Sequence, residues 1–478
     1  MERYKVDFIE FALKVGALKV GADWNLKSGR SSPYFMNVGE FNNGVSLASL
    51  GRAYADTVLA SGVEVDVVYG IPEKGVALVA STATALAEKE KNVGWFFTRK
   101  FPKAHGEFSG LKVEERAKKL IVGYVPEKEE AIAQLDDVFT DGASKNEARE
   151  LLQSFGLENL PLLAIGVDRQ EVGVDGRNAI AEYEAKTGTK VVAIVTANEI
   201  YRFLNEAVGI ENPNGVITAG AVERVANYLR VYGTELGKKG IGNLEQKIVD
   251  AGKSIIPACD LPSLEHFESL VKQTSDQPGI GAYKVGFSLG LRYGLPRVVE
   301  TARKYTSKPL IYDHQKAATD IPDIGKDFAL LNKEAGIDAV ILFPQAGSET
   351  ERAWIYHALN QGLKVIVGGR MTHKAFVVSE GGFITDEGAL RIYQIAARAG
   401  VNHFVVPGNK PEVIQQIKEL VEAEGVDPVF YSPGFVVQGG LIGEAAKVAG
   451  KSWHAIVGRG IYEAKDMRAA ALEYTSQL

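Results

Sequence analysis

The sequence predicts an α/β protein in which an N-terminal α/β domain is followed by a (β/α)8 barrel. Two observations lead to this prediction. Short apolar segments typical of buried strands alternate with helical patterns along the chain. From residue 247 onward this alternation becomes regular and yields eight strand–helix units. The length of 478 residues also exceeds what one ordinary hydrophobic core holds.

The composition is that of a soluble globular protein, with 46% hydrophobic and 24% charged residues. A net charge of −6 provides no general attraction to nucleic acid or anionic membranes, so we expect neither as a partner. The single cysteine, Cys259, excludes an intrachain disulfide and a cysteine-based zinc site. No apolar run reaches membrane length and the first residues lack a signal-peptide core, so we expect a cytoplasmic enzyme.

Residues 1–205 are predicted to form the first domain. Its strand candidates are residues 65–69, 95–98, 132–135, 162–167 and 191–195. Two of its loops are basic: the first carries Lys27 and Arg30, and the second carries Arg99, Lys100, Lys103 and His105. The second loop is punctuated by Pro and Gly, which suits a mobile anion-binding flap. A basic run can equally be a solvated surface, and the residues alone leave both interpretations open.

Residues 132–145 combine a strand, two acids and a small-residue turn that opens a helix. Asp136 and Asp137 at the strand end are placed to accept hydrogen bonds from the two hydroxyls of a ribose. Backbone N–H groups around the turn, at Thr140, Gly142 and Ser144, would cradle a phosphate. This division of labour suits a sugar phosphate better than a nucleoside triphosphate, because the Gly-x-x-x-x-Gly-Lys spacing is missing.

Residues 136–144, Asp-Asp-Val-Phe-Thr-Asp-Gly-Ala-Ser, resemble the phosphoribosyl-pyrophosphate motif of type I phosphoribosyltransferases. Three further segments resemble the orotate phosphoribosyltransferase family in particular. They are Leu-Lys-Ser-Gly-Arg-Ser-Ser-Pro-Tyr-Phe at 26–35, Arg-Lys-x-x-Lys-x-His-Gly-Glu at 99–107 and Val-Asp-Arg-Gln-Glu at 167–171. Two residues depart from the family pattern: Gln134 in the apolar strand and Asp141 in the phosphate loop.

The resemblance implies a type I phosphoribosyltransferase fold with orotate and phosphoribosyl pyrophosphate as substrates and Mg²⁺ bridging the donor. It assigns the contact with orotate to Arg169, and it implies a flexible loop that closes over the partner subunit's site. Lys103 on that loop is a catalytic candidate. The implied pyrophosphate ligands are Lys27, Lys74, Arg99, Lys100, Lys103 and His105.

Residues 206–246 are rich in Gly and Asn and surround a helical pattern at 221–232. We interpret this region as a linker with a packing helix and place the domain boundary inside it.

Residues 247–478 are predicted to form the barrel. The strand candidates end near Asp260, Gly286, Asp313, Phe343, Gly368, Pro407, Ser432 and Gly458. Helical patterns lie between them at 264–272, 296–304, 350–360, 388–399 and 411–424. Because the spacing is nearly even and no sequence repeat is present, a barrel is favoured over a solenoid.

Chemistry in such barrels takes place at the C-terminal strand ends, where we place Asp260, Lys284, Asp313 and Arg459. After the third strand, two carboxylates flank one ammonium, at Asp313, Lys316 and Asp320. These three charges are costly to desolvate unless the groups pair or react. Thr372 is a candidate lid residue after the fifth strand. The loops after the seventh and eighth strands suit a phosphate dianion through Pro433, Gln438, Gly439, Gly458 and Arg459.

This half resembles the orotidine 5'-phosphate decarboxylase family. The residues that carry the resemblance are Tyr-Lys-Val-Gly at 283–286, Asp313, Lys316, Asp320-Ile-Pro, Ser432-Pro-Gly, Gln438 and Gly458-Arg459. The family pattern is Asp-x-Lys-x-x-Asp, whereas here two residues separate Asp313 from Lys316 and three separate Lys316 from Asp320.

The resemblance implies decarboxylation of orotidine 5'-phosphate without a cofactor, with Lys316 as the proton donor. Asp313 would face the substrate carboxylate, and Lys284 would hold Asp313 charged and touch the ribose. Asp320 would reach into the other subunit, which implies a homodimer or a higher oligomer. Joined in one chain, the two halves resemble the bifunctional UMP synthases, which make orotidine 5'-phosphate and convert it to UMP.

Three alternatives remain open from the residues. One half, most readily the first because of Asp141, could be an inactive dimerisation scaffold. The altered spacing after the third strand could belong to a metal-dependent hexulose-phosphate synthase with the same barrel. Finally, Gly-Phe-Ser-Leu-Gly at 286–290 matches a hydrolase nucleophile elbow, although no histidine partner can be placed.

Overall fold

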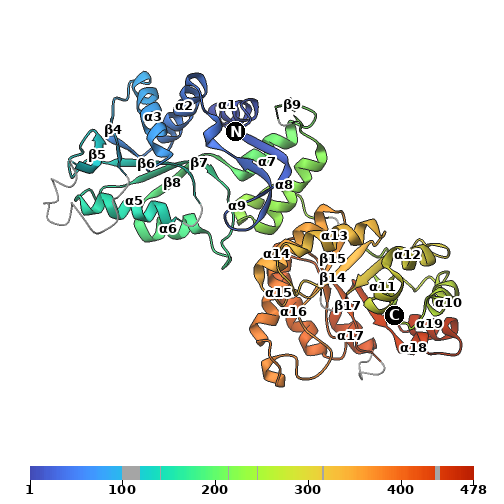
Figure 1. Ribbon diagram of the computed structural model, residues 1–478. Helices are drawn as coiled ribbons and strands as arrows, with labels where there is room; N and C mark the ends of the chain where they lie inside the picture. The colour runs from blue at the N-terminus through green and yellow to red at the C-terminus, as the bar shows by residue number, and fades with distance from the viewer. Residues whose placement is uncertain (100–118, 140–141, 214, 245, 315–316, 436–441) are drawn as a thin grey trace. The chain divides into compact units, whose positions relative to one another are not determined.

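The structure is a computed structural model that describes residues 1–99, 119–139, 142–213, 215–244, 246–314, 317–435 and 442–478 (Figure 1). The chain divides into two compact units, Met1–Ile241 and Gly242–Leu478. In the described part of the chain, no helix has both the length and the apolar character needed to cross a membrane.

The first unit is built on a six-stranded sheet with the order β5-β4-β3-β6-β7-β8. All neighbouring strands are parallel except the antiparallel edge pair β4 and β5. Every strand predicted for this domain is present. The strands are β3 (Val67–Gly70), β4 (Gly94–Thr98), β5 (Ile121–Gly123), β6 (Ile132–Val138), β7 (Leu162–Asp168) and β8 (Lys190–Thr196). Because helices cover both faces, the central strands read as almost continuous apolar runs.

Helices pack on both faces of this sheet (Figure 1). One face carries α1 (Arg3–Lys14), α2 (Gly44–Ala60) and α3 (Gly75–Glu88), and the other carries α5 (Ala143–Ser154) and α6 (Ala179–Thr187). Leu151 and Leu152 of α5 and Tyr183 of α6 join Tyr69 and Leu163 of the sheet in one buried cluster. Because β3, β6 and β7 are parallel neighbours, their C-terminal ends lie at the same edge of the sheet.

A hairpin and a group of helices complete the first unit. The hairpin, β1 (Leu18–Asn25) and β2 (Ser31–Met36), packs against α8. The remaining elements are α7 (Ala197–Glu206), β9 (Glu211–Asn212), β10 (Gly215–Val216), α8 (Ala219–Tyr232) and α9 (Glu235–Lys238). The helix in the segment interpreted as a linker is therefore part of the packed first unit, and its Tyr228 and Tyr232 are buried.

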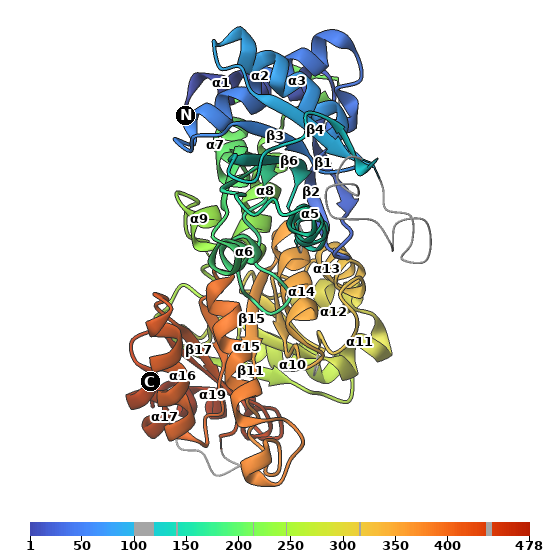
Figure 2. The same ribbon diagram turned by 90° about the vertical axis from the view of Figure 1, so that its left-hand side faces the viewer.

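The second unit is a closed barrel of eight parallel strands in sequential order, surrounded by helices (Figure 2). The predicted barrel is confirmed. Its strands are β11 (Lys253–Cys259), β12 (Tyr283–Gly286), β13 (Leu310–Asp313), β14 (Ala339–Leu342), β15 (Lys364–Gly368), β16 (His403–Val405), β17 (Val429–Ser432) and β18 (Trp453–Val457). Its helices are α10 (Leu264–Thr274), α11 (Phe287–Tyr293), α12 (Leu295–Arg303), α13 (Ile324–Glu334), α14 (Ser348–Asn360), α15 (Asp386–Arg398), α16 (Pro411–Ala423), α17 (Ile442–Ala449), α18 (Arg459–Tyr462) and α19 (Met467–Thr475).

The barrel interior is apolar in the middle and polar near its N-terminal end. Isoleucines from several strands fill the centre, namely Ile256, Ile311, Ile341, Ile366 and Ile456. Nearer the N-terminal ends of the strands, Ser254 Oγ lies 2.8 Å from Nδ1 of His454. The Tyr431 hydroxyl lies 3.0 Å from Nδ1 of His403. Both histidines are buried, and the strand ends with the candidate chemistry lie at the opposite end of the barrel.

Candidate active sites

In the first unit, two acids at the end of β6 are each paired with a lysine. The carboxylate of Asp136 lies 2.6 Å from Nζ of Lys145, and the carboxylate of Asp137 forms an ion pair with Lys74. Lys74 precedes α3, whereas Lys145 lies in the first turn of α5. The structure therefore brings together the predicted residues Lys74, Asp136 and Asp137 and adds Lys145, which the sequence did not single out.

The Asp136–Lys145 pair is buried, which makes its electrostatics different from those of a surface pair. Burial raises the pKa of Asp136, and the ammonium of Lys145 opposes that rise. Lys145 also donates a 2.6 Å hydrogen bond to the backbone oxygen of Val138. A periodicity argument could have found Lys145, because it lies on the same buried face of α5 as Ala148 and Leu152.

The segment between β6 and α5 is described only at Phe139 and Gly142, next to its two ends. Gly142, directly before α5, has a φ of 78°, a left-handed conformation that glycine adopts without strain. Ser144 is exposed in the first turn of the helix. Thr140 and Asp141 lie outside the described residues, so the phosphate cradle predicted here stays a prediction.

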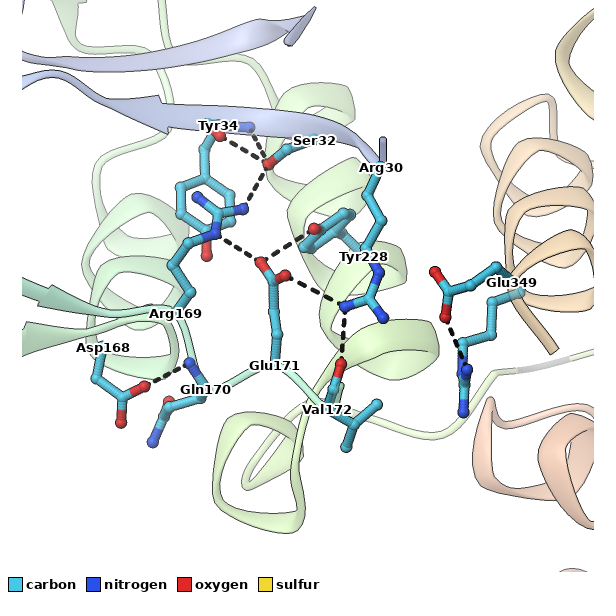
Figure 3. A network of polar contacts seen from close by, with 11 residues as sticks. Arg30, Ser32, Tyr34, Asp168, Arg169, Gln170, Glu171, Val172, Tyr228 and Glu349 are labelled. Atoms are coloured by element: carbon cyan, nitrogen blue, oxygen red, sulfur yellow. Dashed lines mark hydrogen bonds and ion pairs between the residues drawn. The ribbon is translucent and has the colours of Figure 1, made fainter. Parts of the chain in front are cut away.

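A second cluster in the first unit surrounds Arg169, in the loop after β7 (Figure 3). Nε of Arg169 donates to the carboxylate of Glu171 at 2.6 Å, and an Nη donates to Oγ of Ser32 at 2.9 Å. The guanidinium lies over the ring of Tyr34, with Cζ 4.3 Å from the ring centroid. Burial disfavours the charged form, but Glu171, Tyr34 and Tyr228 together outweigh this effect and raise the pKa of Arg169.

Glu171 is the centre of this cluster. Its carboxylate also accepts a 3.0 Å hydrogen bond from the hydroxyl of Tyr228 on α8 and lies 3.4 Å from Nη1 of Arg30 (Figure 3). Arg30 is held more closely by the backbone oxygen of Val172, at 2.8 Å. Neither Glu171 nor Tyr228 was a candidate from the sequence, since their contacts join segments that are far apart along the chain.

The remaining basic candidates of the first unit are exposed or undescribed. Lys27 lies in the turn between β1 and β2, and Arg99 follows β4; both are exposed. Lys100, Lys103 and His105 of the predicted flap lie outside the described residues. The structure therefore leaves the prediction for the flap untested.

In the second unit, Lys284 of β12 lies between two acids on the neighbouring strand ends. Its Nζ is 2.9 Å from the carboxylate of Asp313, the last residue of β13, and 3.6 Å from that of Asp260, which follows β11. Lys284 is buried, and although desolvation disfavours its ammonium, Asp313 and Asp260 raise its pKa. Gly286 makes room for this arrangement, because a Cβ at that position would collide with Oδ1 of Asp260.

The other barrel candidates lie in loops at the same end of the strands. Asp320 is exposed after β13, and Arg459 is exposed at the start of α18, next to Gly458. The backbone oxygens of Thr372 and Pro433 accept hydrogen bonds from Asn409 and Gly408, at 3.0 and 2.8 Å, which joins the loops after β15, β16 and β17. Lys316, Gln438 and Gly439 lie outside the described residues.

Comparison with known proteins identifies the first half. The orotate phosphoribosyltransferase of Saccharophagus degradans is 39% identical over 239 residues, which are 49% of this chain and 100% of that protein. The orotate phosphoribosyltransferase of Pseudomonas aeruginosa is 38% identical over 207 residues, which are 43% of this chain and 91% of that protein. The chain belongs to the orotate phosphoribosyltransferase family.

The orotate phosphoribosyltransferase match accounts for the N-terminal half, and a second family accounts for the rest. Residues 253–474 match the model of the "Orotidine 5'-phosphate decarboxylase / HUMPS family". A solved orotidine 5'-monophosphate decarboxylase from Methanocaldococcus jannaschii, in complex with the inhibitor BMP, is 25% identical. The match covers 47% of this chain and 98% of the solved chain, with a TM-score of 0.42. Orotate phosphoribosyltransferase relatives over the first half and this family model over the second half are consistent with a fused UMP synthase.

Proposed function

We propose that this chain is a bifunctional enzyme of pyrimidine biosynthesis. The first unit transfers a phosphoribosyl group from phosphoribosyl pyrophosphate to orotate, and the second converts the resulting orotidine 5'-phosphate to UMP. The observation that carries the proposal is that two compact units, each matched to a different family, have a buried lysine–carboxylate pair of their own at the C-terminal strand ends. A cytoplasmic location is part of the same proposal.

In the first unit, Arg169 binds the carboxylate of orotate, and the turn before α5 receives the phosphate of the donor. Mg²⁺ accompanies the donor: it commonly binds through substrate phosphates, water and only one or two carboxylates. This mode fits the first unit, where Asp136 and Asp137 are adjacent at the end of β6, while the described residues hold no cluster of three or more His, Cys, Asp or Glu side chains suited to a metal.

In the second unit, the bond between C6 of the pyrimidine and the carboxyl carbon breaks, CO2 leaves, and the electron pair stays on C6. Lys316 then delivers a proton to C6. Asp313 lies beside the substrate carboxylate, and Lys284 keeps Asp313 ionised through the 2.9 Å contact. Arg459 and the loop after β17 hold the phosphate, whose binding energy is used at the reacting centre.

A homodimer or a higher homo-oligomer completes the proposal. Asp320 is exposed, and Ile321 and Ile324 beside it are 58% and 40% exposed, so this segment offers apolar surface to a second copy of the chain. Asp320 would enter the partner's site across that contact.

The experiment measures the two reactions separately on the whole chain. Orotidine 5'-phosphate is incubated with the protein in EDTA, and its loss is followed by absorbance. Orotate and phosphoribosyl pyrophosphate are then supplied with Mg²⁺. We expect both reactions, with Lys316→Ala abolishing only the decarboxylation and Arg169→Ala abolishing only the transfer.

The alternatives predict different results in this experiment. Decarboxylation that disappears in EDTA would favour a metal-dependent barrel enzyme. Decarboxylation without any transfer would make the first unit a scaffold. A chain that performs neither reaction would overturn the proposal.

A further inference from the structure

Glu171 lies in the loop after β7 and connects the proposed orotate-binding arginine to the rest of the first unit (Figure 3). Its shortest contact, 2.6 Å, is with Nε of Arg169. The 3.4 Å approach of Arg30 is too long for a strong hydrogen bond, so Arg169 is the main partner of this carboxylate. The hydroxyl of Tyr228 donates to the same oxygen atom of Glu171 at 3.0 Å.

The backbone of this loop is fastened to the C-terminal end of α8. Val172 N–H donates to the backbone oxygen of Tyr232 at 2.8 Å, and Thr234 N–H donates to that of Gln170 at 2.7 Å. These bonds fix where the Arg169 side chain begins, but its long chain still has several free torsions. The contacts that restrict those torsions come from Glu171, Ser32 and Tyr34.

We propose that Glu171 is a positioning residue of the transferase site, and that Tyr228 of α8 holds Glu171 in place. The Glu171 carboxylate binds one edge of the Arg169 guanidinium and so fixes the plane in which the guanidinium contacts the carboxylate of orotate. This inference rests on the proposed function of the first unit. It adds two residues that act on orotate only through Arg169.

Stability alone explains this arrangement poorly. Removing two charges from water costs about as much as their attraction returns, so apolar residues of similar size would stabilise the same space equally well. A bidentate or edge-on carboxylate, in contrast, constrains the direction of a guanidinium. Preorganised side chains of this kind lower the entropy lost when a ligand binds.

The test uses Glu171→Gln, which keeps the size of the side chain and removes its charge, and Tyr228→Phe, which removes only the hydroxyl. KM for orotate and KM for phosphoribosyl pyrophosphate are measured together with kcat. The control is Glu223→Gln, an exposed glutamate on α8 that pairs with Arg230 at 2.7 Å. Decarboxylase activity of each preparation reports the amount of chain, and KM for phosphoribosyl pyrophosphate shows whether the first unit is folded.

We expect Glu171→Gln to raise KM for orotate roughly tenfold or more, as the loss of a charge-assisted hydrogen bond implies, with KM for the donor nearly unchanged. Tyr228→Phe should give a smaller shift in the same direction, and Glu223→Gln should behave as the unmodified chain. An equal fall in activity at all orotate concentrations with unchanged KM would overturn the proposal and leave Glu171 a structural residue. If the unmodified chain transfers nothing to orotate, the proposed function fails instead.

Discussion

The ammonium of Lys284 lies 2.9 Å from the carboxylate of Asp313, although the two residues are on different strands of the barrel. The parallel register places Lys284 beside Ile311 on β13 and beside Ala258 on β11, two residues before Asp313 and Asp260 respectively. The lysine side chain therefore extends along the barrel axis and reaches both acids at the strand ends. This geometry leads to the first prediction.

Replacing Lys284 by Met should abolish decarboxylation and leave the transferase reaction intact. Without the ammonium, Asp313 stays largely buried with no cation, and its negative charge is no longer available at the reacting carboxylate. Loss of such an electrostatic contact typically lowers kcat by about a hundredfold or more. Breaking a buried pair also destabilises by about 3 to 5 kcal/mol, which urea unfolding of the second unit would detect.

The double variant Lys284→Met with Asp313→Leu serves as the control for stability. It removes both charges and should recover part of the lost unfolding free energy without recovering any activity. A Lys284→Met protein that decarboxylates at the normal rate would refute the assigned role.

Lys145 should be needed for the transferase reaction even though no sequence motif marks it. In Lys145→Met, Asp136 loses the cation at 2.6 Å that opposes the effect of burial, so its pKa should rise further. We expect a higher KM for phosphoribosyl pyrophosphate and a less stable first unit, with decarboxylation unchanged. Steady-state kinetics with the donor varied would check this.

Lys119→Met provides the comparison for this variant. Lys119 is an exposed lysine of the same unit, and its substitution should leave KM for the donor unchanged. Equal effects of the two substitutions would show that total charge, and not the pair with Asp136, controls donor binding.

The barrel should lose stability in mild acid because of two buried histidines. Burial lowers the pKa of His403 to about 4 and that of His454 to about 3, from an ordinary value of 6.5. Below pH 6.5 the unfolded chain takes up protons that the folded chain excludes, so the free energy of unfolding falls with falling pH. The fall ends near the folded pKa values. At pH 5 each histidine lowers stability by about 2 kcal/mol relative to neutral pH.

Urea unfolding of the second unit at pH 7 and pH 5 measures this effect. The variant His454→Gln removes one of the two groups, so the difference between the two pH values should shrink by about half. Identical pH dependence in both proteins would mean that carboxylates alone are responsible for the acid sensitivity.

The fold was more accessible from the sequence than the sites were. The barrel could be predicted because buried parallel strands are nearly pure apolar runs, and such runs end close to Asp260, Asp313 and Ser432 as expected. The β1–β2 hairpin was missed, because polar residues and a glycine interrupt the apolar residues of its first strand, in which only Leu18 is buried. In strands of this kind the apolar pattern that identifies a strand is weak.

The sites were predicted where chemistry resides in one short motif. Asp136, Asp137 and Asp313 each follow an apolar run directly, so their position at a strand end could be inferred. Glu171 and Tyr228 are different, because their contact is tertiary. Glu171 ends the quoted segment 167–171, but the sequence alone assigned no role to either residue. Their relation depends on the packing of α8 against the first unit. The sequence predicted a packing helix at 221–232 but not the surface against which it packs.

The last prediction concerns where the chain can be divided. Fragments 1–241 and 242–478 follow the two compact units, and each should fold and retain its own reaction. A first fragment that ends at residue 205 lacks α8 and with it Tyr228 and Tyr232, each of which covers roughly 150 to 250 Å² of apolar surface. It should aggregate or lose transferase activity.

A second fragment that begins at residue 247 lacks Gln246. The backbone oxygen of Gln246 accepts from Nε2 of His403, and its side-chain oxygen accepts from the backbone N–H of Val365 at 3.2 Å. Removing Gln246 leaves two buried donors without partners, at a cost of about 1 to 3 kcal/mol each. The fragment from 247 should therefore melt at a lower temperature than the fragment from 242, although both contain all the decarboxylase candidates. Equal melting temperatures would show that the barrel needs nothing before residue 247.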